Sequence, residues 1–403
     1  MKTVLLIGTL DTKGAEYAFV RDLIQARAVN TLVMDLGSVG APAITPDIAA
    51  DEVARRGGSS LKAIHERGDR GEAVSTMLAG ARVITREAFA AGRFSGVLGL
   101  GGGGGTAMIT AAMRVLPVGI PKVMVSTMAS GNTAPYVDVK DVTMMYSVVD
   151  IAGLNPLSRR ILANAAGAIV GMVEQDLEPA ADRPLIAATM FGVTTPCVTA
   201  ARERLEAAGY EVLVFHATGS GGRAMEGLID DGWFAGVLDV TTTEWADEVV
   251  GGVLTAGPDR LSAAGRKGVP QVVSVGALDM VNFGAPDSVP ARYANRLLYR
   301  HNPSVTLMRT TPDECGEIGR RIAAQLNRAT GPVVVLLPKR GVSMIDRDGQ
   351  PFHDPAADDS LFAALRGALR QDIRVRELDA HLNDAEFAHA LADELLALLA
   401  SRT

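Results

Sequence analysis

The sequence predicts an α/β protein with two Rossmann-like subdomains, each built on a mainly parallel sheet. Three observations support this fold class: short apolar runs alternate with helix-forming segments, glycine-rich stretches follow such runs, and phrases of the first half return in the second. Trp233–Val240 (WFAGVLDV) echoes Arg93–Leu100 (RFSGVLGL), and Val272–Val275 echoes Val123–Ser126. We interpret these echoes as a diverged internal duplication.

The N-terminal subdomain, residues 1–178, contains apolar runs that are typical of buried parallel strands. These runs are Val4–Gly8, Thr31–Asp35, Phe94–Leu100, Lys122–Ser126 and Val142–Ser147. Apolar spacing predicts helices over Ala15–Ala26, Ile48–Arg56, Glu72–Ala91, Ala107–Leu116 and Asn155–Glu174. The polar segment Thr9–Gly14 is expected to be a loop. Asn155-Pro156 is a typical helix start, because asparagine caps well and proline fits the first helical position.

The C-terminal subdomain, residues 183–403, restarts the same plan after the polar, proline-containing linker Gln175–Arg183. Its predicted strands are Leu185–Gly192, Glu211–Phe215, Trp233–Val240, Val272–Val275, Ser304–Met308, Val333–Leu337 and Ile373–Leu378. Its predicted helices are Cys197–Ala208, Ala224–Asp231, Asp313–Asn327 and Asp384–Leu399. The alternation of strands and helices favours right-handed parallel connections.

The composition is typical of a folded soluble protein, with 48% hydrophobic and 21% charged residues in 403. The net charge of −7 and the lack of a basic block argue against a nucleic-acid partner. Two cysteines, Cys197 and Cys315, are too few for a disulfide framework, so we expect a cytoplasmic protein. We find neither a secretory signal nor an apolar run of ~18 residues, and therefore expect no membrane partner.

The run Gly101–Gly105 lies between an apolar strand and a helix-forming segment. Glycine fills no core and loses much backbone entropy when it is ordered, so five in a row point to a sharp bend or a close approach to a ligand. Backbone N–H groups and the helix dipole favour an anion, typically phosphate, at the start of a helix. A flexible linker is the alternative interpretation.

Ligands of open α/β sheets bind at the carboxyl ends of the strands. We therefore expect a nucleotide to contact the polar residues and glycines that follow the strands of the first half: Thr9, Asp11, Thr12, Lys13, Gly101, Gly102, Gly103, Gly104, Gly105, Thr106, Ser126, Thr127, Ser130 and Gly131. Lys13 is expected to meet a phosphate, and Thr106 to add a hydroxyl. Asp11 is expected to bind Mg²⁺ or a ribose hydroxyl, or alternatively only to cap the next helix.

Named nucleotide motifs match this half only in part. A Walker A loop needs lysine before its final Ser/Thr, and Thr106 lacks that lysine. The dinucleotide fingerprint is absent after the first strand, although Asp35 stands where an NAD-type acid would lie, which keeps NAD as an alternative. Histidine and cysteine spacings are not those of a metal site.

The strand ends of the second half carry more ionisable groups. His216 and Glu244 could serve as acid and base, with Asp279 beside them. An anionic substrate would be bound by the basic residues Arg223, Arg309, Lys339 and Arg340. The alternatives are that these cations pair with Asp239 or Asp279, and that His216 is an ordinary loop residue.

Several unusual phrases of the chain belong together. They are Gly8–Gly14 (GTLDTKG), Gly101–Thr106, Ser126–Gly131 (STMASG), Ser147–Asn155 (SVVDIAGLN), Met190–Cys197 (MFGVTTPC), Phe215–Glu226 (FHATGSGGRAME), Gly236–Glu244 (GVLDVTTTE), Ser274–Gly284 (SVGALDMVNFG) and Asn383–Phe387 (NDAEF). With them the chain resembles the family of the ATP-binding N-terminal domain of the tomato mosaic virus resistance protein and its bacterial relatives. The likeness runs over nearly the whole chain.

The resemblance implies a two-subdomain, Rossmann-like protein that binds ATP with Mg²⁺ and forms homodimers. In the plant protein the domain inhibits a viral replication protein and continues into a barrel-like domain, so this chain would be a stand-alone form. The resemblance supplies no reaction. Three functions stay open: an ATP-binding protein with a catalytic or substrate cleft between the subdomains, a metabolic enzyme for an anionic carboxylate or sugar acid, and a non-enzymatic, ATP-bound regulator of a partner protein.

Overall fold

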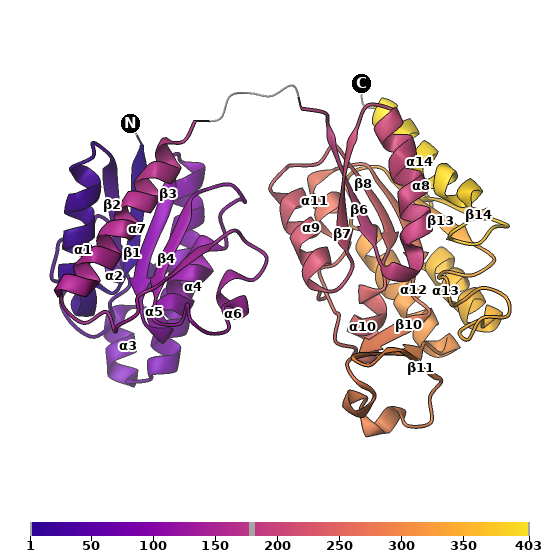
Figure 1. The fold of residues 1–403 in the computed structure, drawn as a ribbon, viewed down its shortest axis with the longest axis horizontal. Coiled ribbons are helices and arrows are strands. Elements are labelled where there is room, and N and C mark those ends of the chain that lie inside the picture. The colour runs from indigo at the N-terminus through magenta and orange to yellow at the C-terminus, as the bar shows by residue number, and fades with distance from the viewer. Residues whose placement is uncertain (1, 177–181, 402–403) are drawn as a thin grey trace. The chain divides into compact units, whose positions relative to one another are not determined.

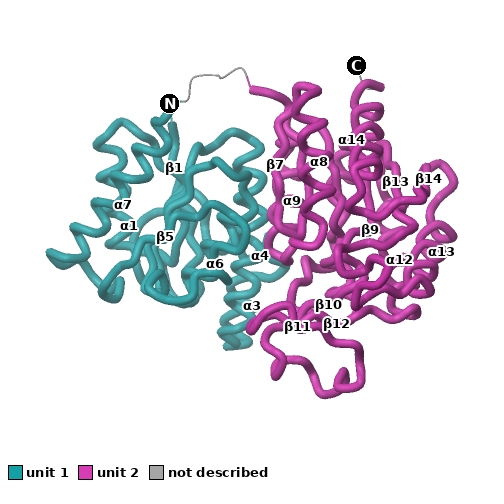
Figure 2. The backbone as a smooth tube through the Cα atoms, turned by 45° about the vertical axis from the view of Figure 1, so that its right-hand side comes forward, with its two compact units in different colours: residues 1–179 teal, residues 180–403 magenta. Residues whose placement is uncertain are grey.

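The computed structural model describes residues 2–176 and 182–401 (Figure 1). The chain forms two compact units, Met1–Pro179 (unit 1) and Ala180–Thr403 (unit 2), shown in separate colours in Figure 2. Residues 177–181, within the expected linker, lie outside the described residues. Both units are α/β, as the sequence predicts.

Unit 1 is built on one parallel sheet with the strand order β2-β1-β3-β4-β5. Its strands are β1 (Thr3–Gly8), β2 (Asn30–Asp35), β3 (Gly96–Gly101), β4 (Lys122–Ser126) and β5 (Thr143–Tyr146). Its helices are α1 (Leu10–Gln25), α2 (Ala50–Arg56), α3 (Leu61–Arg67), α4 (Arg70–Ala90), α5 (Gly103–Met113), α6 (Ala134–Val137) and α7 (Pro156–Glu174). All five predicted strands are confirmed within one or two residues at each end.

Helices cover both faces of this sheet. Val4 and Leu6 of β1 belong to the core under α1 and α7, whereas Leu5 and Ile7 belong to the core under α2, α4 and α5. Successive side chains of a strand point to opposite faces, so a strand covered on both faces is apolar throughout. The run Val4–Ile7 is read correctly from the sequence for this reason.

Two helix starts differ from the prediction. The segment Thr9–Gly14 is not a loop: α1 begins at Leu10, and the backbone of Lys13 (φ −131°, ψ 21°) kinks its first turns. Helix α5 begins at Gly103 rather than Ala107, so three of the five glycines are helical. Glycine costs about 1 kcal/mol relative to alanine inside a helix, and propensity alone therefore placed the start of α5 too late.

Unit 2 has a six-stranded parallel sheet with the order β14-β13-β9-β8-β6-β7, and a small antiparallel sheet with the order β10-β12-β11. The strands are β6 (Leu185–Met190), β7 (Glu211–His216), β8 (Gly236–Thr241), β9 (Gln271–Gly276), β10 (Met280–Phe283), β11 (Leu298–Asn302), β12 (Val305–Arg309), β13 (Val333–Pro338) and β14 (Arg374–Leu378). The α-helices are α8 (Thr195–Ala207), α9 (Ser220–Asp230), α10 (Glu244–Val250), α11 (Ala263–Lys267), α12 (Pro312–Leu326), α13 (Pro355–Ala368) and α14 (Ala385–Ala400), and the 3-10 turns are Gly192–Thr194, Pro286–Ser288 and Ala291–Tyr293.

The antiparallel sheet is the main departure from the predicted plan of unit 2. The run predicted over Ser304–Met308 is a strand, β12, but it pairs with β10 and β11 outside the parallel sheet. An apolar run specifies a buried strand and leaves its partner open. Helices α10, α11 and α13 were not predicted either.

The two parallel sheets share their topology. Numbered along each unit, both begin with the order 2-1-3-4, so β6, β7, β8 and β9 take the places of β1, β2, β3 and β4. The echoed phrases fall on matching strands, one pair on β3 and β8 and the other on β4 and β9. This is the arrangement that an internal duplication requires.

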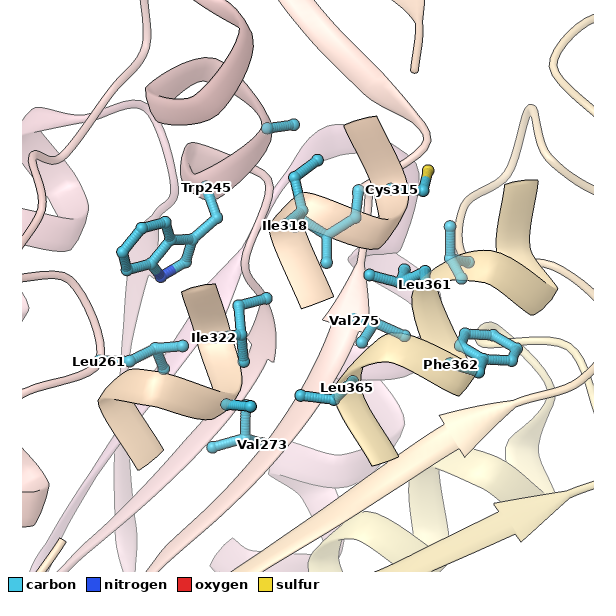
Figure 3. Packing of buried hydrophobic residues seen from close by; sticks show 14 of the residues in the cluster. Trp245, Leu261, Val273, Val275, Cys315, Ile318, Ile322, Leu361, Phe362 and Leu365 are labelled. Atoms are coloured by element: carbon cyan, nitrogen blue, oxygen red, sulfur yellow. The ribbon is translucent and has the colours of Figure 1, made fainter. Parts of the chain in front are cut away.

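Unit 2 is likewise packed on both faces of its parallel sheet. Helices α8 and α14 cover one face, and α10, α12 and α13 contribute to the core on the other. Figure 3 shows Ile318 and Ile322 of α12 beside Leu361 and Leu365 of α13, with Trp245 of α10 at the edge of the same cluster. This core packs α10, α12 and α13 against the parallel sheet of unit 2.

Candidate functional site

A cavity of about 670 Å³ opens at the carboxyl edge of the unit 1 sheet. Strands β2 and β3 lie on opposite sides of β1, so the strand order reverses between β1 and β3. Open α/β sheets bind ligands at such a switch point, where the loops after the two strands diverge. The residues that follow β1 and β3, Thr9–Lys13 and Gly102–Gly105, both line the cavity, Leu10 excepted.

The start of α5 faces this cavity without a side-chain cap. Gly102 is the cap residue and offers no side chain, and the first helical residues are Gly103, Gly104 and Gly105. The N–H groups of a first helical turn have no partner within the helix and carry the positive end of its dipole. Gly103 and Gly104 are also exposed. The site therefore offers several backbone donors to an anion.

The fold does not require glycine along the whole run. A Cβ atom at Gly101 would lie 3.1 Å from backbone atoms of Gly105, which explains that one glycine by packing. Cβ atoms at Gly104 and Gly105 would meet nothing within 4 Å, and neither residue has a positive φ. Alanine would be more stable at these helical positions. Packing within the fold therefore does not explain the glycines at positions 104 and 105.

Tyr17 of α1 fixes the distance between β1 and β3 where they diverge. Its hydroxyl accepts a hydrogen bond from the N–H of Leu100 at 2.7 Å and donates one to the carbonyl of Ile7. A Cβ atom at Gly8 would lie 2.0 Å from the Tyr17 ring, so the ring needs glycine there. This contact accounts for the first glycine of the GTLDTKG phrase.

Asp35, the residue that would suggest NAD, serves the protein itself. It is buried at the end of β2, and its Oδ1 accepts hydrogen bonds from the N–H groups of Leu10 (3.0 Å) and Gly37 (2.8 Å). Burial raises the pKa of this carboxyl. Because its oxygen satisfies the first N–H group of α1, it also explains why the helix begins as early as Leu10.

Asp11 holds the loop after β2 against the cavity. Its Oδ2 accepts hydrogen bonds from the N–H groups of Val39 (3.0 Å) and Gly40 (3.2 Å). Its Oδ1 is shielded from solvent and has no hydrogen-bond partner among the described residues. Asp11 therefore has a structural role and keeps one oxygen unused.

Lys13, Thr9 and Thr12 line the cavity, as the sequence predicts for residues after the first strand. The Lys13 ammonium donates to the carbonyl of Ile151, in the segment before α7. The Thr9 and Thr12 hydroxyls lie 2.8 Å apart and bond to each other. Each of these side chains thus already has a partner in the protein.

Thr106 and four candidate residues at and after the end of β4 lie outside the cavity lining. Thr106 is fully buried, and its hydroxyl lies 2.6 Å from the Ser126 hydroxyl, which also accepts from the N–H of Met128. These hydroxyls join α5 to β4 and do not line the cavity. Thr127, Ser130 and Gly131 are outside its lining as well. The Thr106 and Ser126 side chains, predicted to contact a nucleotide, are buried and bonded to each other, and they lie outside the cavity lining.

Sequence reasoning missed one wall of the cavity. This wall consists of Leu36, Ser38 and Val39 after β2, Ile64, His65, Gly68, Asp69, Arg70, Ala73 and Val74 of α3 and α4, and Met108 of α5. Helix α3 has only seven residues, too few for a visible period. Its start was nevertheless readable, because Ser60 caps it and Asp69 caps α4.

In unit 2, Glu244 is an internal anion rather than an exposed acid or base. Its side chain is buried, and Oε1 accepts from the N–H groups of Gly219 (2.7 Å) and Gly222 (3.1 Å) at the start of α9. His216 is exposed and stacks on Phe191 with 5.3 Å between ring centroids. The two residues do not form a solvent-facing catalytic pair, which corrects the predicted roles.

The partner of Glu244 is Arg260, which the sequence reasoning did not single out. Its guanidinium is buried and bonds to Glu244 Oε2 at 2.6 Å and to both oxygens of Asp239 at 2.5 and 2.7 Å. Glu226 lies 3.3 Å away, and burial raises the pKa of its carboxyl. Asp239 is thus paired with an arginine, but not with one of those proposed.

Arg309 and Asp279 belong to a second buried cluster. The Arg309 guanidinium bonds to Asp358 at 2.9 Å and Asp346 at 3.2 Å, so it is not available to an anionic substrate. Asp279 accepts from the Ser343 hydroxyl at 2.8 Å, and burial raises its pKa to about 6. Burial and the neighbouring carboxylates raise the pKa of Asp346 to about 10. We read this cluster as structural.

The remaining predicted cations lie on the surface. The Arg223 guanidinium is 3.3 Å from the carbonyl of Thr255. Lys339 is exposed directly after β13, and its neighbour Arg340 pairs with Asp379 at 2.7 Å. The structure does not gather Arg223, Arg309 and Lys339 into one substrate site.

Asp279→Asn is expected to flatten the pH dependence of unit 2 stability. The folded-state pKa of Asp279 is about 6, above its ordinary value of 3.8. The stability that the protonated carboxyl contributes is therefore complete below pH 3.8 and is lost as the pH rises through about 6. Asparagine does not ionise. The stability of wild type relative to Asp279→Asn should therefore fall between pH ~4 and ~6.

Urea denaturation followed by tryptophan fluorescence measures this, because both tryptophans of the chain, Trp233 and Trp245, are in unit 2. Parallel pH profiles of the two proteins would contradict the assignment.

In residues 2–176 and 182–401, no three His, Cys, Asp or Glu side chains are grouped as metal ligands would be. In the same ranges, no helix has the length and apolarity needed to cross a membrane. Cys197 and Cys315 are both buried and free.

Comparison with known proteins gives consistent matches along the chain. The models of the Uncharacterised protein family (UPF0261) match residues 2–178 with the N-terminal domain and 183–399 with the C-terminal domain. A UPF0261 protein of Clostridium tetani is 52% identical over 400 residues, 99% of each chain. The ToMV susceptible protein tm-1(GCR26) of Solanum lycopersicum is 40% identical over 416 residues, which cover 98% of this chain and 55% of the tomato protein.

Among solved structures, the glycosyl transferase family 9 protein of Veillonella parvula aligns over 99% of this chain and 98% of its own, with 9% identity and a TM-score of 0.24. That score supports no statement about function. The family matches and the close relatives agree over both units, and they confirm the resemblance read from the sequence phrases. The chain therefore belongs to the UPF0261 family.

Proposed function

We propose that unit 1 binds ATP in the cavity between β1 and β3. The observation that carries this proposal is the uncapped start of α5, where exposed glycines that the fold does not need face the cavity. Phosphate binds well at such a helix start because backbone donors and the helix dipole both favour an anion. The resemblance to the family of the ATP-binding N-terminal domain of the tomato protein favours ATP as the nucleotide.

The rest of the cavity suits the other end of a nucleotide. Ile64, Val74 and Met108 form an apolar wall opposite the polar residues after β1. Val39 lines the same cavity and is 83% exposed, so a flat apolar base could cover it. Ligand sites commonly combine apolar walls with a few placed polar groups, and a volume of about 670 Å³ is in their usual range.

Calorimetric titration of the full chain with ATP tests the proposal. We expect saturable binding of ATP and weaker binding of AMP, because AMP has fewer oxygens for the α5 donors. A thermal shift on adding ATP should accompany the heat, since a ligand that binds only the folded state stabilises it. Absence of both signals at millimolar ATP would contradict the proposed function.

Mg²⁺ fits this site as a companion of the phosphates. In proteins Mg²⁺ often keeps several waters and takes one or two carboxylates plus phosphate oxygens, so no all-protein cage is needed. Asp11 lines the cavity and has one oxygen without a hydrogen-bond partner among the described residues. We propose Asp11 as the protein ligand, which would help to neutralise phosphate charge through the ion.

Asp11→Asn should reduce the benefit that Mg²⁺ gives to ATP binding. Asparagine keeps an oxygen for the N–H groups of Val39 and Gly40, but it removes the charge that attracts the ion. We expect the Mg²⁺-dependent gain in ATP affinity to shrink by roughly tenfold. Titration with EDTA is the control, because affinity without Mg²⁺ should change little. An unchanged Mg²⁺ effect would remove Asp11 from the metal site.

The proposal assigns no reaction to unit 2, since Glu244, Asp279 and Arg309 are all buried in contacts with other protein groups. ATP turnover, measured with and without candidate carboxylates or sugar acids, separates an enzyme from an ATP-bound regulator. The homodimer and the cytoplasmic location also belong to the proposal; light scattering of the purified chain and cell fractionation test them.

A further inference from the structure

We propose that Arg70 contacts the phosphates of the bound nucleotide and sets a preference for the triphosphate. This inference rests on the proposed function. Arg70 is the first residue of α4 and lines the same cavity as the start of α5. Helices α4 and α5 pack side by side over one face of the sheet, and both begin at the cavity. Arg70 and the glycine N–H donors of α5 therefore lie at the same cavity.

The acidic neighbours of Arg70 are already engaged. Asp69 caps α4, and its Oδ1 accepts from the N–H groups of Gly71 (2.7 Å) and Glu72 (3.0 Å). The Glu72 carboxylate pairs with Arg67 at 2.5 Å. Within residues 2–176 and 182–401, the exposed Arg70 guanidinium has neither a hydrogen bond nor an ion pair.

Its position is unfavourable without a ligand. The start of a helix carries the positive end of the dipole, so a cation there is repelled and an anion is attracted. An anion bound between α4 and α5 would reverse this balance for Arg70. A negatively charged ligand next to Arg70 would therefore be stabilised by both the helix dipole and the guanidinium.

The other basic side chains of the cavity have partners. The Lys13 ammonium donates to the carbonyl of Ile151, and the His65 Nε2 lies 2.6 Å from the carbonyl of Ser38. Among the basic residues that line the cavity, Arg70 is the one whose guanidinium N–H groups are all available within the described residues. Guanidinium also binds phosphate oxygens with two parallel hydrogen bonds, which an ammonium does not.

Arg70→Ala should weaken ATP binding by roughly 10- to 100-fold, which is the usual effect of losing a charge-assisted hydrogen-bonded pair. The loss should be smaller for ADP and AMP and absent for adenosine, because the contact is to phosphate. Arg70→Lys should recover part of the affinity. Arg82→Ala is the matched control, since Arg82 is exposed on the same helix and outside the cavity lining.

Calorimetric titration of the four proteins with ATP, ADP, AMP and adenosine decides the matter. If wild type binds no ATP, the proposed function fails. If wild type binds ATP and Arg70→Ala binds it equally well, only the role of Arg70 fails. An equal loss for ATP and adenosine would also overturn it, because Arg70 would then act through the base or the fold. A thermal unfolding curve for each variant shows whether it is folded.

Discussion

Gly104→Val is expected to abolish ATP binding while unit 1 stays folded. A Cβ atom at Gly104 meets nothing within 4 Å in the protein, so the new side chain enters the cavity rather than the core. There it would keep phosphate away from the N–H groups of Gly103 and Gly105. We expect an affinity loss of about 100-fold or more, from lost charge-assisted hydrogen bonds and steric exclusion. Calorimetry measures the affinity, and circular dichroism checks the fold.

Alanine at the same position separates the effect on ATP affinity from the effect on the stability of the fold. Gly104→Ala should raise the free energy of unfolding by about 0.5–1 kcal/mol, since glycine is the poorer helix former. It should still weaken ATP binding. Gly171→Ala in α7 is the control: that position is also exposed and open around its Cβ, but it is outside the cavity. Unchanged ATP affinity in both Gly104 variants would make the run structural.

Arg260→Met is expected to destabilise unit 2 by about 3–5 kcal/mol, the usual range when one partner of a buried ion pair is removed. It would leave the carboxylates of Glu226, Asp239 and Glu244 without the cation that all three face. Denaturation followed by tryptophan fluorescence reports on unit 2. Arg204→Met, which removes an exposed pair with Asp393, should change the transition little.

The loss in Arg260→Met should depend on pH. Burial raises the folded-state pKa of Glu226, and Arg260 lowers it, so the variant raises that pKa further above the unfolded value. The variant then folds best below the unfolded pKa and loses stability as the pH rises through the folded one. The deficit against wild type should therefore be smaller near pH ~4 than near pH ~8. A deficit of equal size at both pH values would argue that the carboxylates are not the cause.

The sequence predicts the framework of this protein well, because a strand covered on both faces must be apolar. That rule locates β1, β3 and β4, whereas the strand order, and with it the switch point, is known only from the structure. The ligand site at the glycine run stays a prediction; the structure adds that Cβ atoms at Gly104 and Gly105 would meet nothing within 4 Å, so packing does not explain these two glycines. The start of α1 was missed because its signal, the Asp35 carboxylate, lies 25 positions away in the chain from Leu10.

The predicted catalytic cluster shows what could not be inferred from the sequence, namely which polar side chains pair with one another inside the protein. Polar residues at strand ends look alike in sequence whether they face solvent or one another. Glu244 lies at the expected strand end, yet its partner Arg260 sits in an irregular segment with no pattern to mark it. Pairing of buried charges depends on three-dimensional distance, which spacing along one chain does not report. Arg70 was missed for a related reason, because α3 and the start of α4 were not resolved by periodicity.

The Glu244 carboxylate at the start of α9 has a consequence for how the two halves respond to their surroundings. An anion that is part of the chain has a fixed local concentration, so the start of α9 is satisfied without any added ligand. The start of α5 has no side-chain cap and no acidic residue in its first turn, and in the proposed function the phosphates of ATP take that place when ATP is present. Local opening of unit 1 should therefore vary with ligand supply, whereas that of unit 2 should not, and hydrogen exchange would show the two halves as one constant and one responsive part of the same chain.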